Sequence, residues 1–198
     1  METLERPPIT HTTELLAGSK YGGLLMSKAD FLRWESDDDE FVYEFDHGIL
    51  DPTRSMQQKE AYIIANIGYK FYDTQAFKQR GQLIPEIDVW VNDSQRRRPD
   101  LAFFTADQIR AMADGQNEIP AFAVEILSDY DEVNKQLKKF NEYFAAGVQA
   151  VWWIIPDLNM VYCYTSPKTI AVATGADSLS AAPALADLTL TGDELFRR

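Results

Sequence analysis

Two short apolar runs, each carrying one carboxylate, constrain this chain more than any other feature. Asp100 is followed by Leu-Ala-Phe-Phe, and Glu125, twenty-five residues later, is preceded by Phe-Ala-Val. Runs of this length and composition are typical of buried strands. A carboxylate in such a strand is costly to bury unless it is paired, hydrogen-bonded or bound to a metal. The two runs therefore predict neighbouring core strands with a polar site where they meet.

A lysine-bearing helix follows the second run. The spacing predicts a helix over 131–146, ended by Gly147, with Lys139 fourteen residues after Glu125. Its apolar positions recur at helical spacing and predict a buried face of Val133, Leu137, Phe140 and Phe144. The alternative for Lys139 is an ordinary solvated face shared with Lys135 and Lys138.

These residue types suit a hard cation and a phosphate. Mg²⁺ or Mn²⁺ prefers oxygen ligands, and one or two carboxylates hold Mg²⁺ while it keeps several waters. Asp100 and Glu125 are the candidate ligands, with the carbonyl of Ile126 as a third, and Lys139 would orient water or stabilise developing charge. The alternative for Asp100 is that it only starts a strand after Pro99 and caps a turn.

Composition limits the other function classes. The chain of 198 residues has one cysteine, Cys163, and two histidines, His11 and His47, which argues against a disulfide and against zinc. It has no apolar run of membrane-spanning length and no signal-peptide pattern, so we expect a cytoplasmic protein with no membrane partner. The formal charge of -12 opposes nucleic-acid binding unless cations gather at one groove.

Hydrophobic patterning predicts a mixed sheet flanked by helices, of the α/β or α+β class. The predicted strands are 41–50, 82–92, 99–104, 121–127, 151–155 and 160–165. Helices are predicted near 28–34, 55–71 and 131–146, with a short one after Thr105. We expect residues 1–20 to form a tail or arm and residues 21–198 to form a single domain.

A family resemblance rests on Lys139, Tyr143 and four segments, 43–50, 98–101, 123–128 and 151–154. In these positions the chain is similar to a large bacterial family of "putative restriction endonucleases" within the PD-(D/E)XK nuclease superfamily. The resemblance extends from residue 28 to residue 197 and implies a restriction-endonuclease-like fold with a divalent-metal site.

The resemblance also implies roles for individual residues. Asp100 and Glu125 would be the metal ligands, and Glu44 would be an accessory acid near the site. Lys139 would replace the lysine that other superfamily members place two residues after the glutamate, where this chain has Leu127.

Three positions depart from the family pattern. Ser128-Asp129-Tyr130 stands where the family often has Ser-Pro-Ser, and Asp129 would either add a ligand or cap the helix. Gln57-Gln58 replaces a frequent histidine, and His47 replaces an acid before Gly48. Because His47 falls in a predicted turn, we expect an exposed or hydrogen-bonded imidazole there.

The combined features predict a divalent-metal-dependent endonuclease that hydrolyses phosphodiester bonds of duplex DNA. The alternative is a non-catalytic binding or assembly module on a nuclease fold, which suits the negative charge. Arg96–Arg98 would contact phosphate or form a solvated loop. Aromatic residues in 151–155 and 161–164 predict excess apolar surface and therefore a homodimer, with packing of the Trp152-Trp153 pair favoured over base stacking.

Overall fold

The larger of two main sheets contains the predicted core strands. The computed structural model describes residues 18–128 and 132–198, and its six-stranded sheet has the order β10-β9-β8-β7-β6-β3. The strand bounds are β3 Gln82–Pro85, β6 Leu101–Phe104, β7 Phe122–Ile126, β8 Ala150–Ile155, β9 Met160–Ser166 and β10 Thr169–Thr174. β7 and β8 are parallel while the other neighbours are antiparallel, so the sheet is mixed, as predicted.

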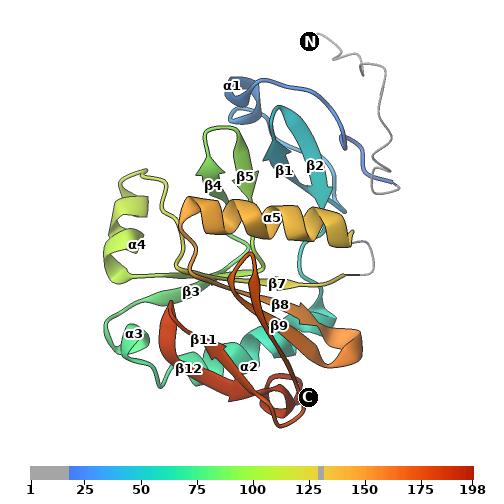
Figure 1. Cartoon of the computed structure of the whole chain (residues 1–198). Coiled ribbons are helices and arrows are strands. Elements are labelled where there is room, and N and C mark those ends of the chain that lie inside the picture. The colour runs from blue at the N-terminus through green and yellow to red at the C-terminus, as the bar shows by residue number, and fades with distance from the viewer. Residues whose placement is uncertain (1–17, 129–131) are drawn as a thin grey trace.

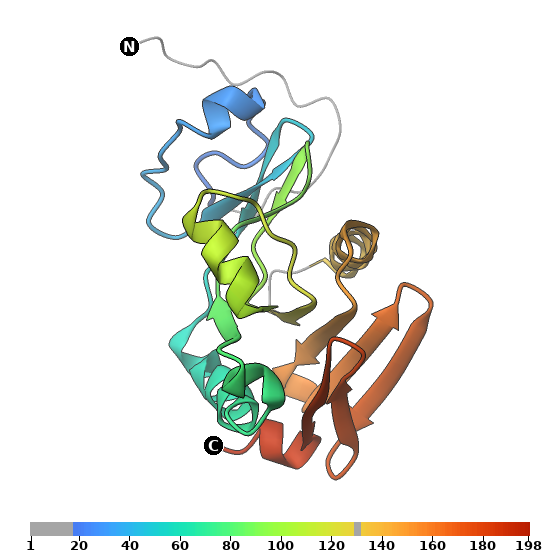
Figure 2. The same cartoon turned by 90° about the vertical axis from the view of Figure 1, so that its left-hand side faces the viewer.

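Helices and a hairpin cover both faces of this sheet (Figures 1 and 2). On one face, Trp152 packs in a core with residues of α2 and the β11–β12 hairpin, and on the other, Trp153 packs with residues of α5 and α4. The bounds are α2 Ala61–Phe71, α4 Ala106–Ala113, α5 Val133–Ala146, β11 Ser178–Ala181, β12 Leu185–Thr191 and α6 Gly192–Leu195. Strand alternation sends the two indoles to opposite faces, so the prediction that they pack is confirmed.

The expected excess of apolar surface on these strands is wrong. β8 lies between β7 and β9, and β9 lies between β8 and β10. Residues 151–154, Val161, Cys163 and Tyr164 are all buried within the chain. The layers that bury them are α5 on one side and α2 with the hairpin on the other, so these side chains are not available for the predicted dimer contact.

A second, antiparallel sheet of four strands has the order β2-β1-β5-β4. Its bounds are β1 Val42–Asp46, β2 Ile49–Thr53, β4 Val89–Asn92 and β5 Gln95–Arg97, and α1 Lys28–Phe31 packs on it through an aromatic core. The single strand predicted over 41–50 is instead the β1–β2 hairpin. Its two-residue turn, His47 and Gly48, has positive φ at both positions (51° and 89°), the geometry that matches strand twist in tight hairpins.

The strand predicted over 82–92 is also two strands, and they belong to different sheets. β3 ends at Pro85, and Glu86 adopts a left-handed backbone with φ of 49°, which redirects the chain into β4. β3 is an edge strand, the position where a proline costs no ladder hydrogen bond. The remaining short helices are η1 Gln58–Glu60, α3 Gln75–Lys78 and η2 Pro156–Leu158.

Helix α5 joins β7 to β8 along the chain and lies between the two sheets (Figure 1). Gly147 ends it at φ of 112°, as the sequence predicts. Its buried side chains are Lys139, Phe140 and Tyr143, whereas Val133 and Leu137 are 54% and 39% exposed, so the predicted apolar face is only half right. Within residues 18–128 and 132–198, no helix is both long and apolar enough to cross a membrane.

Candidate active site

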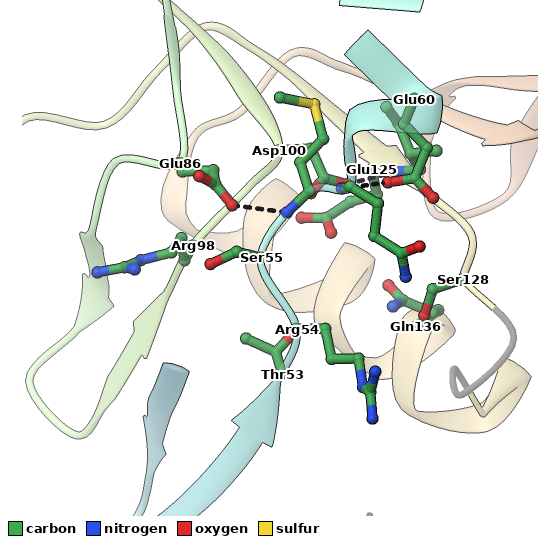
Figure 3. A pocket seen from close by; sticks show the side chains of 13 residues that line it. Thr53, Arg54, Ser55, Glu60, Glu86, Arg98, Asp100, Glu125, Ser128 and Gln136 are labelled. Atoms are coloured by element: carbon green, nitrogen blue, oxygen red, sulfur yellow. Dashed lines mark hydrogen bonds between the residues drawn. The ribbon is translucent and has the colours of Figure 1, made fainter. Parts of the chain in front are cut away.

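Antiparallel pairing of β6 and β7 brings the two predicted carboxylates together. Leu101 pairs with Val124, so the next position along the ladder sets Asp100 opposite Glu125. Residues that face each other across antiparallel strands project from the same side of a sheet. Both residues line one pocket, together with Ile126 (Figure 3). The predicted proximity of the two acids on adjacent central strands is therefore observed.

The Asp100 carboxylate is fixed at the strand end by the backbone of the partner strand. Its Oδ2 accepts a hydrogen bond from the Ile126 N–H at 2.5 Å. A charged acceptor strengthens such a bond. Asp100 therefore does more than start a strand, because its side chain ties β6 to β7 beside the pocket.

Glu125 lies at the back of the pocket and is held from behind by α5. It is 5% exposed. Lys139 Nζ lies 3.1 Å from each of its carboxylate oxygens, and the Tyr143 hydroxyl donates to Oε1 at 2.6 Å. Lysine and tyrosine are four residues apart on α5 and thus share one helix face. Lys139 is buried, so the alternative of a solvated lysine face is wrong for this residue.

Glu44 on β1 is the second carboxylate that contacts Lys139. Its Oε1 lies 2.8 Å from Lys139 Nζ and accepts from the Arg98 backbone N–H at 2.7 Å. Its Oε2 accepts from Arg97 Nη1 at 3.1 Å. Glu44 is buried but is not among the pocket-lining residues, so it reaches the site through Lys139.

The buried charges set each other's protonation. Burial raises the pKa of Glu125 to about 7, and the negative charge of Glu44 adds to this beyond what Lys139 and Tyr143 offset. Burial also acts to raise the pKa of Glu44, but Lys139 and Arg97 outweigh it and the pKa lies below its usual range. Burial opposes the charged form of Lys139, yet Glu125 and Glu44 raise its pKa. Lys139 therefore stays a cation at neutral pH.

Arg97 is the hub of the surrounding ion network, a role the sequence did not suggest. It is 3% exposed on β5, and its guanidinium also contacts Glu142 at 2.7 Å and Asp46 at 3.4 Å. The solvated loop proposed for Arg96–Arg98 is wrong, since β5 includes Arg97. Arg96 and Arg98 both contact Asp88, at 3.0 and 2.8 Å.

The pocket contains further polar groups that sequence reasoning missed. Asp100 and Glu125 lie between Glu86 on one side and Glu60 on the other, while the Arg98 guanidinium points away (Figure 3). Glu86 accepts from the Met56 N–H and Glu60 from the Gln57 N–H, both at 2.8 Å. No motif marked these acids: Glu86 is held by a residue 30 positions away, whereas the Glu60 contact is a local helix cap.

The donor set of the pocket fits a hard divalent cation. Its candidate ligands are the carboxylate oxygens of Asp100 and Glu125, and Ile126 lies beside them in the lining. Gln136 Oε1, also in the lining, is buried and has no hydrogen-bond partner among the described residues. The described chain holds no group of three or more His, Cys, Asp or Glu arranged for a metal. Mg²⁺ held by one or two carboxylates keeps several waters.

Two other residues singled out in the sequence, His47 and Cys163, are not among those that line this pocket. His47 is exposed and its Nδ1 lies 2.9 Å from Ser94 Oγ, as expected for a turn. Cys163 is buried, and burial raises the pKa of its thiol to about 11. Gln57, which stands near the family's histidine position, lines the pocket. Asp129 lies outside the described residues, as do residues 1–17 of the predicted arm.

The mixed sheet, with two acids at adjacent strand ends and a lysine on the following helix, defines a nuclease-like fold. A sequence model of the family described as Uma2, "putative restriction endonuclease", matches residues 29–192, and the chain belongs to this family. The predicted family resemblance is thereby confirmed.

A solved structure supports the fold assignment. It is described as a "putative nuclease belonging to DUF820" from Anabaena variabilis, and it aligns with a TM-score of 0.72 at 21% identity. The match covers 86% of this chain and 97% of that one. At this identity the likeness shows the fold alone. No curated protein matches the chain.

Proposed function

We propose that this protein is a Mg²⁺- or Mn²⁺-dependent endonuclease that hydrolyses phosphodiester bonds in duplex DNA. The observation that carries the proposal is that Asp100, just before β6, and Glu125, near the end of β7, line one pocket, with Lys139 in contact with Glu125. Membership of a nuclease family supports the reaction class.

Asp100, Glu125 and the carbonyl of Ile126 would hold the cation. When bound, it supplies charge neutralisation on the phosphoryl group and acidifies water. Lys139 keeps a fixed positive charge against Glu125, which limits the repulsion that a phosphate would meet from the two acids. Glu44 is a positioning residue, because its contacts to Lys139, Arg97 and Arg98 hold the lysine beside Glu125.

Plasmid cleavage tests the proposal. The wild-type protein should convert supercoiled plasmid to nicked or linear DNA only when Mg²⁺ or Mn²⁺ is present. Asp100→Ala and Glu125→Ala should lose this activity. Asp114→Ala, at the exposed end of α4, is the matched acid-to-alanine control and should retain it. Equal cleavage by the site variants, or cleavage that persists in EDTA, would refute the proposal.

A second candidate function is a binding or assembly module without catalysis. It is favoured by the charge of -12 and by the pairing of Arg96, Arg97 and Arg98 with acids, which leaves these cations engaged within the chain. Calorimetric titration with Mn²⁺ separates the two candidates. Binding that Asp100→Ala removes supports the nuclease, whereas an intact fold that takes up no Mn²⁺ supports the module.

A further inference from the structure

Tyr143 contacts the same carboxylate as Lys139, from one helical turn further along α5. Its hydroxyl donates to Glu125 Oε1 at 2.6 Å, and the residue is 1% exposed. The ammonium of Lys139, by contrast, is shared between Glu125 and Glu44. A phenol offers one directional donor, whereas an ammonium has three that rotate. Tyr143 is therefore the contact that defines how the Glu125 carboxylate is turned.

The packing of Tyr143 fixes the position of this donor. Its ring belongs to the same core cluster as Phe140 and Trp153, on the α5 side of the large sheet. Trp153 on β8 pairs in register with Glu125 on β7, so the phenol enters from the helix above this strand pair. Because buried side chains occupy defined rotamers, the hydroxyl is preorganised rather than recruited when a ligand binds.

Glu125 borders the pocket, whereas the two α5 side chains that contact its carboxylate do not line it. The described lining includes Glu125, Asp100 and Ile126 but neither Tyr143 nor Lys139. A carboxylate has about four lone-pair sites. Lys139 and Tyr143 donate to this carboxylate from outside the pocket lining, and its remaining acceptor capacity is what a cation in the pocket would use.

We infer that Tyr143 is a positioning residue that orients Glu125 toward a divalent cation in the pocket, an inference that rests on the proposed metal-dependent function. It acts as an outer-shell partner of the ligand and need not touch the substrate. Removal of such a partner typically weakens metal affinity by about 10- to 100-fold. The hydroxyl, rather than the ring, carries this role.

Two tyrosine-to-phenylalanine variants isolate the hydroxyl. Tyr143→Phe keeps the ring in the core and removes only the donor. Tyr164→Phe is the matched control, because Tyr164 is also buried and packs on Phe140 with ring centroids 5.1 Å apart. None of the described hydrogen bonds of Glu125 comes from Tyr164. Near-UV circular dichroism and the urea unfolding midpoint verify that both variants keep the fold.

The affinity for Mn²⁺ is measured by calorimetry on the full chain, with Glu125→Gln for comparison. We expect Tyr143→Phe to bind about 10-fold more weakly and Tyr164→Phe to match the wild type. The Mn²⁺ concentration for half-maximal plasmid cleavage should rise by the same factor. If Glu125→Gln loses binding while Tyr143→Phe stays within twofold of the wild type, the inference is overturned and the nuclease proposal stands. If the wild type itself takes up no Mn²⁺, both fall.

Discussion

Replacement of Glu125 by glutamine should change how stability depends on pH. Burial and Glu44 raise the pKa of Glu125 to about 7, against an ordinary value of 4.5. Between these values the folded chain keeps a proton that the unfolded chain has released. Stability from this group is therefore fully present below pH 4.5 and is lost as the pH rises through 7. Glutamine keeps the size of the side chain but has no proton to lose.

The size of the effect follows from the two ionisation points. Linkage over this interval gives a wild-type loss of about 2–3 kcal/mol between pH 5 and pH 8. The free energy of unfolding of Glu125→Gln, taken relative to that of the wild type, should thus increase by that amount from pH 5 to pH 8. Urea unfolding at both pH values in EDTA measures it. A relative stability that stays constant, or falls, would show that Lys139 and Tyr143 stabilise the ionised form at least as much as burial disfavours it.

Tyr143→Phe tests the same reasoning in another way, because it leaves Glu125 ionisable and removes a donor that lowers its pKa. The Tyr143 hydrogen bond favours the charged form of Glu125, so its removal should extend the loss of stability to higher pH. A wild-type pH profile in this variant would contradict the assignment of the phenol as a donor to an ionisable Glu125.

Three further predictions concern the ion network, a helix end and assembly. Arg97→Met should cost about 3–5 kcal/mol in urea unfolding, because it leaves three carboxylates without their buried cation, and a cost below about 1 kcal/mol would contradict the hub role. Gly147→Ala should cost about 1–2 kcal/mol from its left-handed backbone alone, since nothing lies within 4 Å of an added Cβ, and an unchanged unfolding midpoint would refute this. Cleavage of both DNA strands at once would take two copies of the chain, so we expect a homodimer. Light scattering should then give a molar mass of twice 22.5 kDa. A mass of one chain would contradict the dimer and would predict nicked DNA as the first product.

The sequence was sufficient for the parts of the fold that local pattern decides. Short apolar runs identified β6 and β7, and the acid at the end of each run located the site. Gly147 marked the end of α5, because few other residues adopt its backbone conformation. The family motifs recognised in the sequence span the same region that the family model matches.

Local pattern failed where a turn or a partner element decided the outcome. The hairpin at His47-Gly48 and the change of direction at Glu86 were hidden inside runs that alternate like single strands. The apolar spacing of α5 suggested that Val133 and Leu137 are buried. The helix is instead rotated so that Lys139 and Tyr143 face the large sheet.

Only the tertiary structure determined the charge network around the site. Glu44 and Arg97 are 53 residues apart, and Glu125 and Tyr143 are 18 apart, yet each pair is buried in contact. Burial makes each of these ionisable groups depend on its neighbours, since a charge removed from water needs a partner of opposite sign or a hydrogen bond. The amino-acid pattern therefore showed which residues are available for chemistry. The packing of α5 between the two sheets determined which of them meet and in what state of protonation.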